Sequence, residues 1–249
     1  MGKSRSYIGT SGWQYNHWIG TFYPKDVKQA DRFQYYLKFF NTVELNSPFY
    51  RLPGKEIFIK WRKSVPEDFI FSVKANRFIT HMKKLKDPAE SLDKMLEHTM
   101  ALKEKLGPIL FQLPPGWKIN AERLRNFISE LPPGLRYTFE FRNQTWYEED
   151  IFELLKEYNC SFCIYELEGH ITPFKITADF VYVRLHGPGA KYSGSYSDKV
   201  LKTWSKRCIE WMNDKKDVYV YFDNDQAAYA PFNAIRLKEL LEKDYGKNS

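Results

Sequence analysis

Cysteine is scarce in this sequence, which contains only three such residues in 249. Cys160, Cys163 and Cys208 are too few for a disulfide framework, which excludes the small disulfide-stapled secreted folds and favours a reducing, cytoplasmic location. Cys160 and Cys163 are spaced as C-x-x-C, but "NCSFCIYEL" is typical of a strand, where residues three apart point to opposite faces. We therefore expect neither a zinc site nor a redox pair there.

Histidine is scarce as well, with five residues in the whole chain. Multi-zinc barrel nucleases use several histidines and carboxylates, and only His81 and His186 follow predicted strands closely enough to share a site. The sequence therefore predicts no metal ligand set and no certain cofactor. It leaves room for a single Mg²⁺ or Mn²⁺ ion held by carboxylates.

Long apolar runs are also missing. No stretch approaches the roughly 20 residues that cross a bilayer, and no signal-peptide pattern is present, so we expect no membrane partner. Residues 1–6, "MGKSRS", match an N-myristoylation pattern. A strand predicted to begin at once with Tyr7 and Ile8 leaves little chain to present a lipid, which argues against this modification.

Positive charge is what the chain has in excess, with a formal net charge of +7 at pH 7. Such a surface favours acidic partners, namely nucleic acid, phosphorylated metabolites or anionic membranes. The lysines are spread through segments such as "HMKKLKD" and "NDKKD", which is also typical of solvated helix exteriors.

Short β-rich segments alternate with helical patterns along the whole chain. We predict eight strands, at residues 6–10, 42–46, 69–76, 107–114, 136–142, 160–166, 180–187 and 217–224. Helical patterns lie between them at residues 87–107, 120–134 and 148–159, with Gly107 as the stop of the first, and a last helix begins at Pro231. Eight strand–helix units predict an α/β protein, a single (β/α)₈ TIM-type barrel domain spanning residues 1–249. An open doubly wound sheet is the alternative, but no G-x-G-x-x-G follows the first strand.

Polar side chains alternate with apolar ones along the predicted strands, as in "TVELN", "FSVKAN", "TFEFR" and "VYVRLH". Because successive strand residues face opposite ways, the apolar set is expected to face the helices and the polar set the barrel interior. The polar set falls at the carboxyl ends of the strands, where this fold places active sites. A self-satisfied ion network, such as Glu44–Lys74 or Glu140–Arg184, is the structural alternative.

The segment "GTSGWQYNHWIGTFYP", residues 9–24, follows the first strand and carries five aromatic residues. At the mouth of a barrel, aromatic rings can stack on a base or a sugar and exclude water. Alternatively, they plug the end of the barrel. Both interpretations stay open for Trp13 and Tyr15, and plugging is favoured for Phe22 and Tyr23.

Seven motifs in order, "GTSGWQYNHWIGTFYP", "NTVELNSPFYRLP", "FSVKANRFITH", "LGPILFQLPP", "YTFEFRNQTW", "FVYVRLHG" and "VYVYFDNDQAAYAPFNA", resemble the YecE-like family (domain of unknown function 72). The resemblance runs from about Gly9 to Ala234 and implies a TIM-type barrel without a settled activity. The positions that match its motifs are Thr10, Gly12, Trp13, Glu44, Asn46, Lys74, Gln112, Glu140, Arg142, Arg184, His186 and Asn224. The segment "CIYELEGHITPFKIT" departs from the pattern, so roles for Glu166 and His170 stay open.

The residue types at the strand ends point to an anionic ligand. Lys74, Arg142 and Arg184 can hold phosphate or carboxylate, and the glycine-rich loop "HGPGAKYSGSYS" after the seventh strand, with Lys191, is a candidate phosphate cradle. Glu44 and Glu140 are the candidate acid–base pair, and His186 is a further proton carrier. Barrel glycosidases place carboxylates after strands four and seven, where this chain has Gln112 and Arg184, which disfavours that reaction. A Schiff base at Lys74 is a lesser alternative.

Three hypotheses of function follow. The first is a hydrolase or lyase type of enzyme acting on an anionic, phosphate-bearing small molecule. The second is a repair-type nuclease that holds single-stranded or damaged nucleic acid with its aromatic residues, and the third is a non-catalytic binder of a nucleotide-like or sugar-phosphate ligand. We predict Glu44, Glu140 and His186 as catalytic residues. The predicted substrate-binding residues are Thr10, Trp13, Tyr15, Asn46, Lys74, Gln112, Arg142, Arg184 and Asn224.

Overall fold

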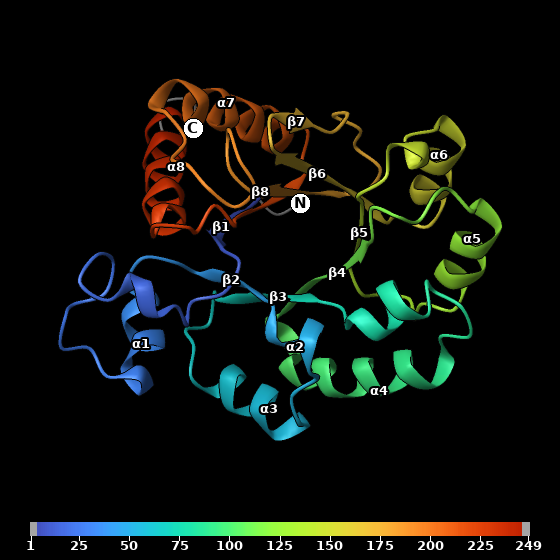
Figure 1. The fold of residues 1–249 in the computed structure, drawn as a ribbon, viewed down its shortest axis with the longest axis horizontal. Helices are drawn as coiled ribbons and strands as arrows, with labels where there is room; N and C mark the ends of the chain where they lie inside the picture. The colour runs from blue at the N-terminus through green and yellow to red at the C-terminus, as the bar shows by residue number, and fades with distance from the viewer. Residues whose placement is uncertain (1–3, 246–249) are drawn as a thin grey trace. The chain divides into compact units, whose positions relative to one another are not determined.

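The computed structural model describes residues 4–245, and the first three residues of the myristoylation pattern, Gly2 among them, lie outside this range. Eight parallel strands alternate with helices along the chain, which is a TIM-type (β/α)₈ barrel fold, as predicted (Figure 1). The strands are β1 (Ser6–Thr10), β2 (Thr42–Leu45), β3 (Ile70–Lys74), β4 (Leu106–Leu113), β5 (Tyr137–Phe141), β6 (Ser161–Leu167), β8 (Phe180–Leu185) and β9 (Asp217–Phe222). A short β7 (His170–Ile171) pairs antiparallel with β6.

Helices follow most strands. The α-helices are α1 (Arg32–Tyr36), α2 (Ser47–Tyr50), α3 (Lys55–Lys63), α4 (Ala89–Thr99), α5 (Ala121–Ser129), α6 (Glu149–Glu157), α7 (Asp198–Asn213) and α8 (Tyr229–Tyr245). Shorter turns are the 3₁₀ segments η1 (Asn16–Trp18), η2 (Gln29–Asp31), η4 (Met100–Lys105) and η5 (Gln144–Trp146), and the π-helix η3 (Phe78–Met82). Within residues 4–245, none of the helices combines the length and apolar composition that a bilayer crossing requires.

The chain divides into two compact units. The first unit comprises the described residues of Met1–Glu44, Ile164–Phe174 and Asp179–Ser249. In it, β9 pairs in parallel with β1 on one side and β8 on the other, so that Val220 lies opposite both Ile8 and Val183. Ser11 forms a parallel bridge with Glu44, and α7 and α8 lie side by side (Figure 1). The carboxyl ends of these strands therefore lie at one edge.

The second unit comprises Leu45–Cys163 and Lys175–Ala178. Its strands pair in parallel in the order β3, β4, β5 and the start of β6, with Lys74 opposite Leu110 and Gln112 opposite Glu140. This register places the carboxyl ends of β3, β4 and β5 at one edge, with Gln112 and Glu140 as direct neighbours on it.

Most polar members of the alternating strands are buried, as the parity of the sequence predicts, and Lys74, Asn76 and Arg142 are half-buried. Glu44, Glu140 and Arg184 are completely inaccessible to solvent, among apolar strand neighbours such as Val183. A charge in such a place costs several kcal/mol unless it is paired and hydrogen-bonded. These side chains therefore need partners, and the structure supplies them.

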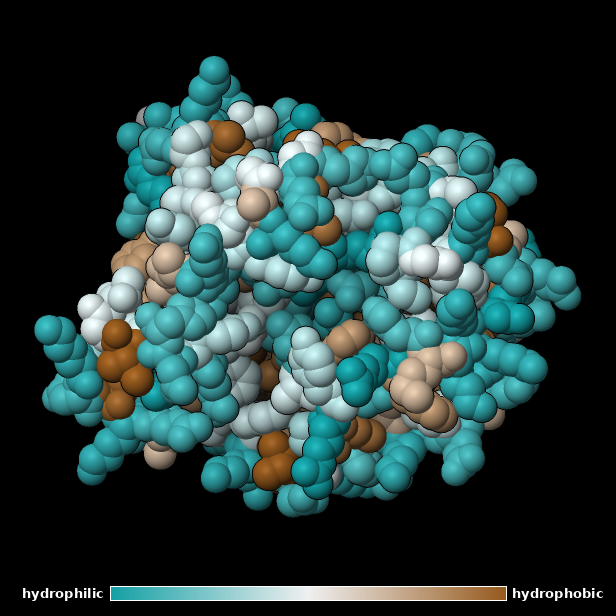
Figure 2. Space-filling view, viewed as in Figure 1, coloured by the Kyte–Doolittle hydropathy of each residue, from teal (hydrophilic) through white to brown (hydrophobic). Residues whose placement is uncertain are grey.

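The exterior of the protein is mainly hydrophilic on the face that Figure 2 shows, and the hydrophobic side chains on that face form small separate groups.

Two predicted helix boundaries are wrong. The pattern at residues 87–107 predicts one helix stopped by Gly107, but α4 ends at Thr99, six residues of 3₁₀ helix follow, and Gly107 lies in β4. Lys103, with φ 51°, breaks the helical backbone. The last helix begins at Tyr229, two residues before the predicted Pro231. Proline is tolerated in the first turn of a helix, where its missing N–H would have no intrahelical partner.

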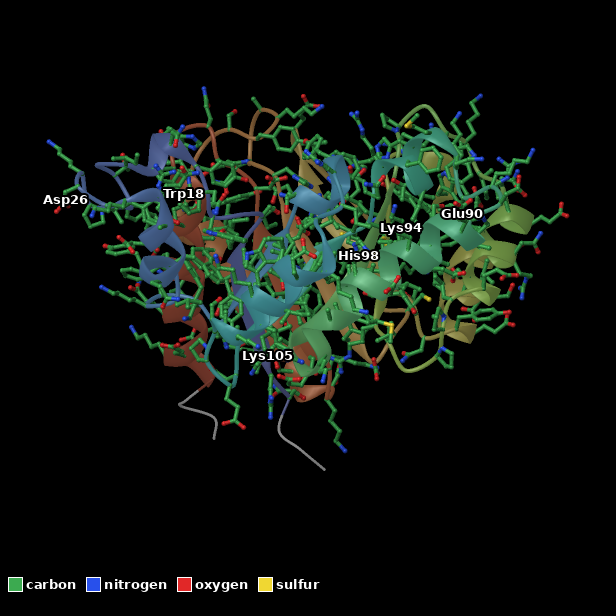
Figure 3. The ribbon with its side chains drawn as sticks, turned by 90° about the horizontal axis from the view of Figure 1, so that it is seen from below. Trp18, Asp26, Glu90, Lys94, His98 and Lys105 are labelled. Atoms are coloured by element: carbon green, nitrogen blue, oxygen red, sulfur yellow. The ribbon has the colours of Figure 1, made fainter. Side chains whose placement is uncertain are left out.

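Along α4, Glu90, Lys94 and His98 follow the i, i+4 spacing of one helix face (Figure 3).

Candidate active site

Glu44 is the centre of a buried hydrogen-bond network in the first unit. Its Oε1 accepts hydrogen bonds from Ser11 Oγ at 2.5 Å and Arg184 Nη2 at 2.7 Å. Its Oε2 accepts from Tyr182 Oη at 2.7 Å and Arg184 Nε at 3.0 Å. A carboxylate has about four lone-pair sites, and four donors occupy them here. Burial, together with the nearby Glu44 charge, raises the pKa of Tyr182, so its hydroxyl stays a donor.

Arg184 links this carboxylate to a histidine–aspartate pair. Nη1 of Arg184 lies 3.3 Å from Nε2 of His186, and Nδ1 of His186 lies 3.0 Å from Oδ2 of Asp223. Because a guanidinium can only donate, Nε2 must accept and Nδ1 must carry the proton that it donates to Asp223. His186 is therefore a neutral imidazole, completely buried and held at both nitrogens.

This arrangement bears on two of the predicted catalytic residues. Glu44 has its acceptor sites filled by donors, which suits it to holding Arg184 rather than to taking a proton. His186 has the Arg184 guanidinium at Nε2 and the Asp223 carboxylate at Nδ1, so both of its ring nitrogens already have partners. The Glu44 network is thus a rigid, fully bonded support at the carboxyl edge of β1, β8 and β9.

A second cluster lies at the carboxyl edge of β3, β4 and β5. Glu140 Oε1 accepts a hydrogen bond from Gln112 Nε2 at 2.9 Å and a short one from Arg142 Nε. Lys74, at the end of β3, lies with Nζ 4.2 Å from the centroid of the Phe49 ring. The planes of the Phe49 and His81 rings are nearly perpendicular, at 82°, with centroids 5.1 Å apart. Lys74, Gln112, Glu140 and Arg142, four predicted residues, thus lie on adjacent strands of one unit.

His81 reports the electrostatics of this second cluster. Burial lowers the pKa of His81 from 6.5, and the positive charge of Lys74 lowers it further. Glu140 raises this pKa, whereas Arg142 and Arg77 lower it. Three of the four charges that act on the imidazole are positive. We call Lys74, Arg77 and Arg142 the cation cluster.

His81 has one ring nitrogen in a hydrogen bond within the second unit. Nδ1 of His81 lies 2.9 Å from the hydroxyl of Thr80, and that hydroxyl donates to the Asn76 carbonyl at 3.4 Å. In the tautomer in which Nδ1 donates to Thr80, Nε2 holds the lone pair. Within residues 4–245, no side chain or backbone group hydrogen-bonds to that Nε2. A neutral, half-buried imidazole with an available basic nitrogen is suited to proton transfer.

The aromatic residues of segment 9–24 pack against one another. Trp13 is only 6% exposed and its ring lies 4.6 Å from that of Phe33. Trp18, labelled in Figure 3, is completely buried and contacts Tyr15, Phe22 and Tyr23. These contacts make a small separate core that closes the loop after β1, so the rings offer little surface to a ligand.

Polar contacts secure the same segment. Thr10 is buried and its hydroxyl donates to the Gly12 carbonyl, while Tyr15 Oη donates to the Ser11 carbonyl. Asp225 accepts hydrogen bonds from Trp18 Nε1 at 2.6 Å and pairs with His17 Nε2 at 2.8 Å. Burial raises the pKa of Asp225 to about 6. Thr10, Trp13 and Tyr15, predicted to bind substrate, thus have structural contacts in this loop.

Asn224 holds the loop after β8. Its Nδ2 donates to the Gly194 carbonyl and to Asn233 Oδ1, both at 2.8 Å. Two amides of this candidate phosphate cradle are already bonded: Gly187 N donates to Tyr196 Oη, and Tyr196 N donates to Asn233 Oδ1. Asn46 lies at the start of α2, and its Oδ1 is buried without a hydrogen-bond partner among the described residues.

Gly187 is required by the shape of this loop. Its φ is +119°, and a Cβ there would lie 2.2 Å from the Ser193 carbonyl oxygen. We expect Gly187→Ala to lower the free energy of unfolding by about 2 kcal/mol or more, because both strain and a backbone clash result. Gly189→Ala is the control, since nothing lies within 4 Å of its Cβ position. Urea unfolding of both variants tests this, and equal stabilities would contradict it.

Several residues of both clusters escape the sequence analysis as site residues. Ser11 and Tyr182 carry no feature of their own that marks them as site residues, and Asp223 and Asp225 are marked only by the "DND" run after β9. His81 stands out in the sequence only as one of two histidines that closely follow predicted strands. The polar parity of "VYVRLH" includes Tyr182 and is the one signal that could have identified it.

The described histidine, cysteine and acidic residues differ from the usual metal and thiol sites in their grouping and burial. No three of the histidine, cysteine, aspartate and glutamate side chains in residues 4–245 are grouped so that they could hold a metal ion. Cys160, Cys163 and Cys208 are buried free thiols, and burial raises the pKa of Cys160 to about 12. A thiol with such a pKa is a poor nucleophile at neutral pH.

Comparison with known proteins gives a consistent family. The family model described as "Protein of unknown function DUF72" matches residues 7–248. The UPF0759 protein YunF of Bacillus subtilis is 27% identical over 276 residues, covering 96% of this chain and 95% of that protein. The UPF0759 protein YecE of Escherichia coli K12 is 26% identical over 142 residues, 57% of this chain and 50% of that protein. A crystal structure of a DUF72 family protein from Thermotoga maritima has a TM-score of 0.84 at 29% identity, covering 96% of this chain and 99% of that one.

Proposed function

Because the chain belongs to the DUF72 family of proteins of unknown function, we propose its function from its own site: it is an enzyme of hydrolase or lyase type that acts on an anionic, phosphate-bearing substrate at the carboxyl edge of β3, β4 and β5. The observation that supports this is the positive electrostatic environment of His81, whose pKa is lowered by burial, Lys74, Arg142 and Arg77.

The cation cluster is suited to holding the anion. Arg142 Nε donates a hydrogen bond to the buried carboxylate of Glu140, which also accepts one from Gln112. The carboxylate therefore orients the guanidinium. Charge-assisted hydrogen bonds from Arg and Lys to phosphate are among the strong ones in proteins. Glu140 thereby acts as a positioning residue for Arg142 rather than as the general base predicted from sequence.

His81 is the proton carrier in this proposal. For hydrolysis of a phosphate ester, His81 Nε2 accepts a proton from the water whose oxygen forms the new bond to phosphorus. The bond from phosphorus to the ester oxygen breaks on the opposite side. That oxygen takes a proton from solvent water as it leaves as an alcohol, and the imidazolium returns its proton to solvent. Water and ester are thus converted to alcohol and inorganic phosphate, with His81 returned to its neutral form.

The nucleic-acid alternative depends on accessible aromatic residues in segment 9–24. Trp13 and Trp18 are buried there, so no observation in that segment favours it. A binding protein without catalytic activity is the remaining alternative, and an assay of turnover distinguishes it from an enzyme.

The test is release of inorganic phosphate from a panel of esters: p-nitrophenyl phosphate, glycerol phosphate and ribose 5-phosphate. We expect turnover of at least one by the wild type, and a fall in kcat of about 100-fold or more in His81→Gln with KM nearly unchanged, because general acid–base groups contribute on that order. His98→Gln on α4 is the control, since His98 Nδ1 only bonds the Pro53 carbonyl. No turnover, or equal turnover in His81→Gln, would overturn the proposal.

A further inference from the structure

Three exposed apolar side chains lie on α2 and η3, the elements that contact β3 and β4. Tyr50 and Met82 are each 68% exposed and Phe78 is 40% exposed. Tyr50 ends α2, and Phe78 and Met82 are the two ends of the π-helix η3. We call these three side chains the aromatic rim. Single exposed apolar residues are common on proteins, so the rim is of interest only because of what adjoins it.

Asn76 fixes the two elements of the rim to each other. Its Nδ2 donates to the Pro48 carbonyl of α2 at 2.8 Å, and its Oδ1 accepts from Phe78 N at 2.8 Å. One side chain at the end of β3 thus sets the positions of both α2 and η3. The rim is therefore a built feature of the second unit, and its residues are placed relative to the strand end that carries Lys74.

Phe49 joins the rim to the cation cluster. It is only 8% exposed, and its ring contacts three neighbours: Tyr50 edge-on at 5.0 Å between centroids, His81 edge-on at 5.1 Å, and Lys74 with Nζ 4.2 Å from its centroid. Lys83 Nζ lies 5.7 Å from the centroid of Phe78. The exposed apolar side chain of Tyr50 and the positive charge of Lys74 thus both adjoin the buried Phe49 ring.

The exposure of the rim contrasts with the aromatic residues of segment 9–24. Trp13, Trp18, Phe22 and Tyr23 are all buried in contacts with one another and with their neighbours. Tyr50 and Phe78 leave flat, apolar surface in water, which has a free-energy cost that a covering ligand would remove. A bare phosphate ion would contact the cations and leave the rim exposed.

We propose that the substrate is a phosphate ester whose organic part carries a flat aromatic ring, of which a nucleoside monophosphate is the simplest case. The phosphate binds Lys74 and Arg142, and the base packs on Tyr50 and Phe78 with Met82 beside it. This inference rests on the proposed function, because it takes the cation cluster as the phosphate site. The same chemistry is presented by a free nucleotide and by the 5′-phosphorylated end of a nucleic-acid strand.

The test compares calorimetric binding of inorganic phosphate, ribose 5-phosphate, adenosine 5′-monophosphate and a 5′-phosphorylated oligonucleotide. We expect the nucleotide to bind about 10-fold tighter than ribose 5-phosphate, which corresponds to stacking of one base. Tyr50→Ala and Phe78→Ala together remove that difference and leave ribose 5-phosphate binding unchanged. Tyr158→Ala, an exposed tyrosine of the same unit at the end of α6, is the control and changes nothing.

The outcomes separate the inference from its premise. Equal binding of the nucleotide and ribose 5-phosphate overturns the aromatic rim as a base site while the anion site stands. No binding of any phosphate overturns both. Binding of the nucleotide at least as tight as the oligonucleotide supports a free metabolite, and tighter binding of the oligonucleotide supports a strand end as the source of the same chemistry.

Discussion

Replacing Arg184 by Met should lower the free energy of unfolding by about 3–5 kcal/mol, because it leaves the Glu44 charge buried without its main partner. Glu44 is completely buried and two of its four hydrogen bonds come from Arg184. Urea unfolding at pH 7, followed by circular dichroism, measures the loss. Arg125→Met is the matched control, since that arginine pairs with Glu157 at side-chain exposures of 51% and 53%. Exposed pairs contribute only about 0–1 kcal/mol.

A double variant shows whether the loss is due to the charge. In Glu44→Leu/Arg184→Met neither charge is present, so we expect it to be more stable than the sum of the single effects implies, by about 1–3 kcal/mol. Additive effects, or a cost of Arg184→Met no greater than that of Arg125→Met, would contradict the account of the Glu44 network as a paired, buried support.

Replacing Lys74 and Arg142 by Gln should each weaken binding of inorganic phosphate about 10-fold or more, and together about 100-fold, because each charge-assisted bond contributes about 1.5–3 kcal/mol. Calorimetry at low ionic strength measures this. Lys74→Gln is the more informative variant, since Arg142→Gln also removes a donor to the buried Glu140. Lys60 is an exposed lysine on α3. Lys60→Gln serves as the control, because it has the same net charge as Lys74→Gln. Loss of affinity in Lys60→Gln equal to that in Lys74→Gln would show a diffuse charge effect and no site.

The strands and the polar edge residues are predictable from the sequence because they rest on local rules. Alternation with a period of two is fixed by the pleat, so "TVELN" and "VYVRLH" show which side chains share a face before any packing is known. Parallel strands separated by helices then place their carboxyl ends together. Helix ends are less predictable: the break after Thr99 depends on the backbone of Lys103, which no residue pattern marks.

The partners of each charged residue are not predictable in the same way. Glu44 accepts from Arg184, 140 positions along the chain, and only the folded chain brings the two together. His81 lies on a π-helix, and nothing in "FITHM" distinguishes that irregular turn from an ordinary helix. The aromatic residues of segment 9–24 were open to two interpretations because a loop that packs on itself has no sequence period.

The most direct test of the anion site is the pKa of His81, measured by NMR with and without inorganic phosphate, with His81→Gln to assign the signal. Without phosphate, the pKa should lie below 6.5, because burial and Lys74 disfavour the imidazolium. In the unfolded chain, His81 is protonated near its ordinary pKa of about 6.5, which is higher than its pKa in the folded protein. As the pH drops from about 6.5 through the folded-state pKa, the free energy of unfolding therefore decreases. Bound phosphate should raise the pKa of His81 and, by linkage, bind more tightly as pH falls. A pKa unchanged by saturating phosphate would contradict the anion site at the end of β3, β4 and β5.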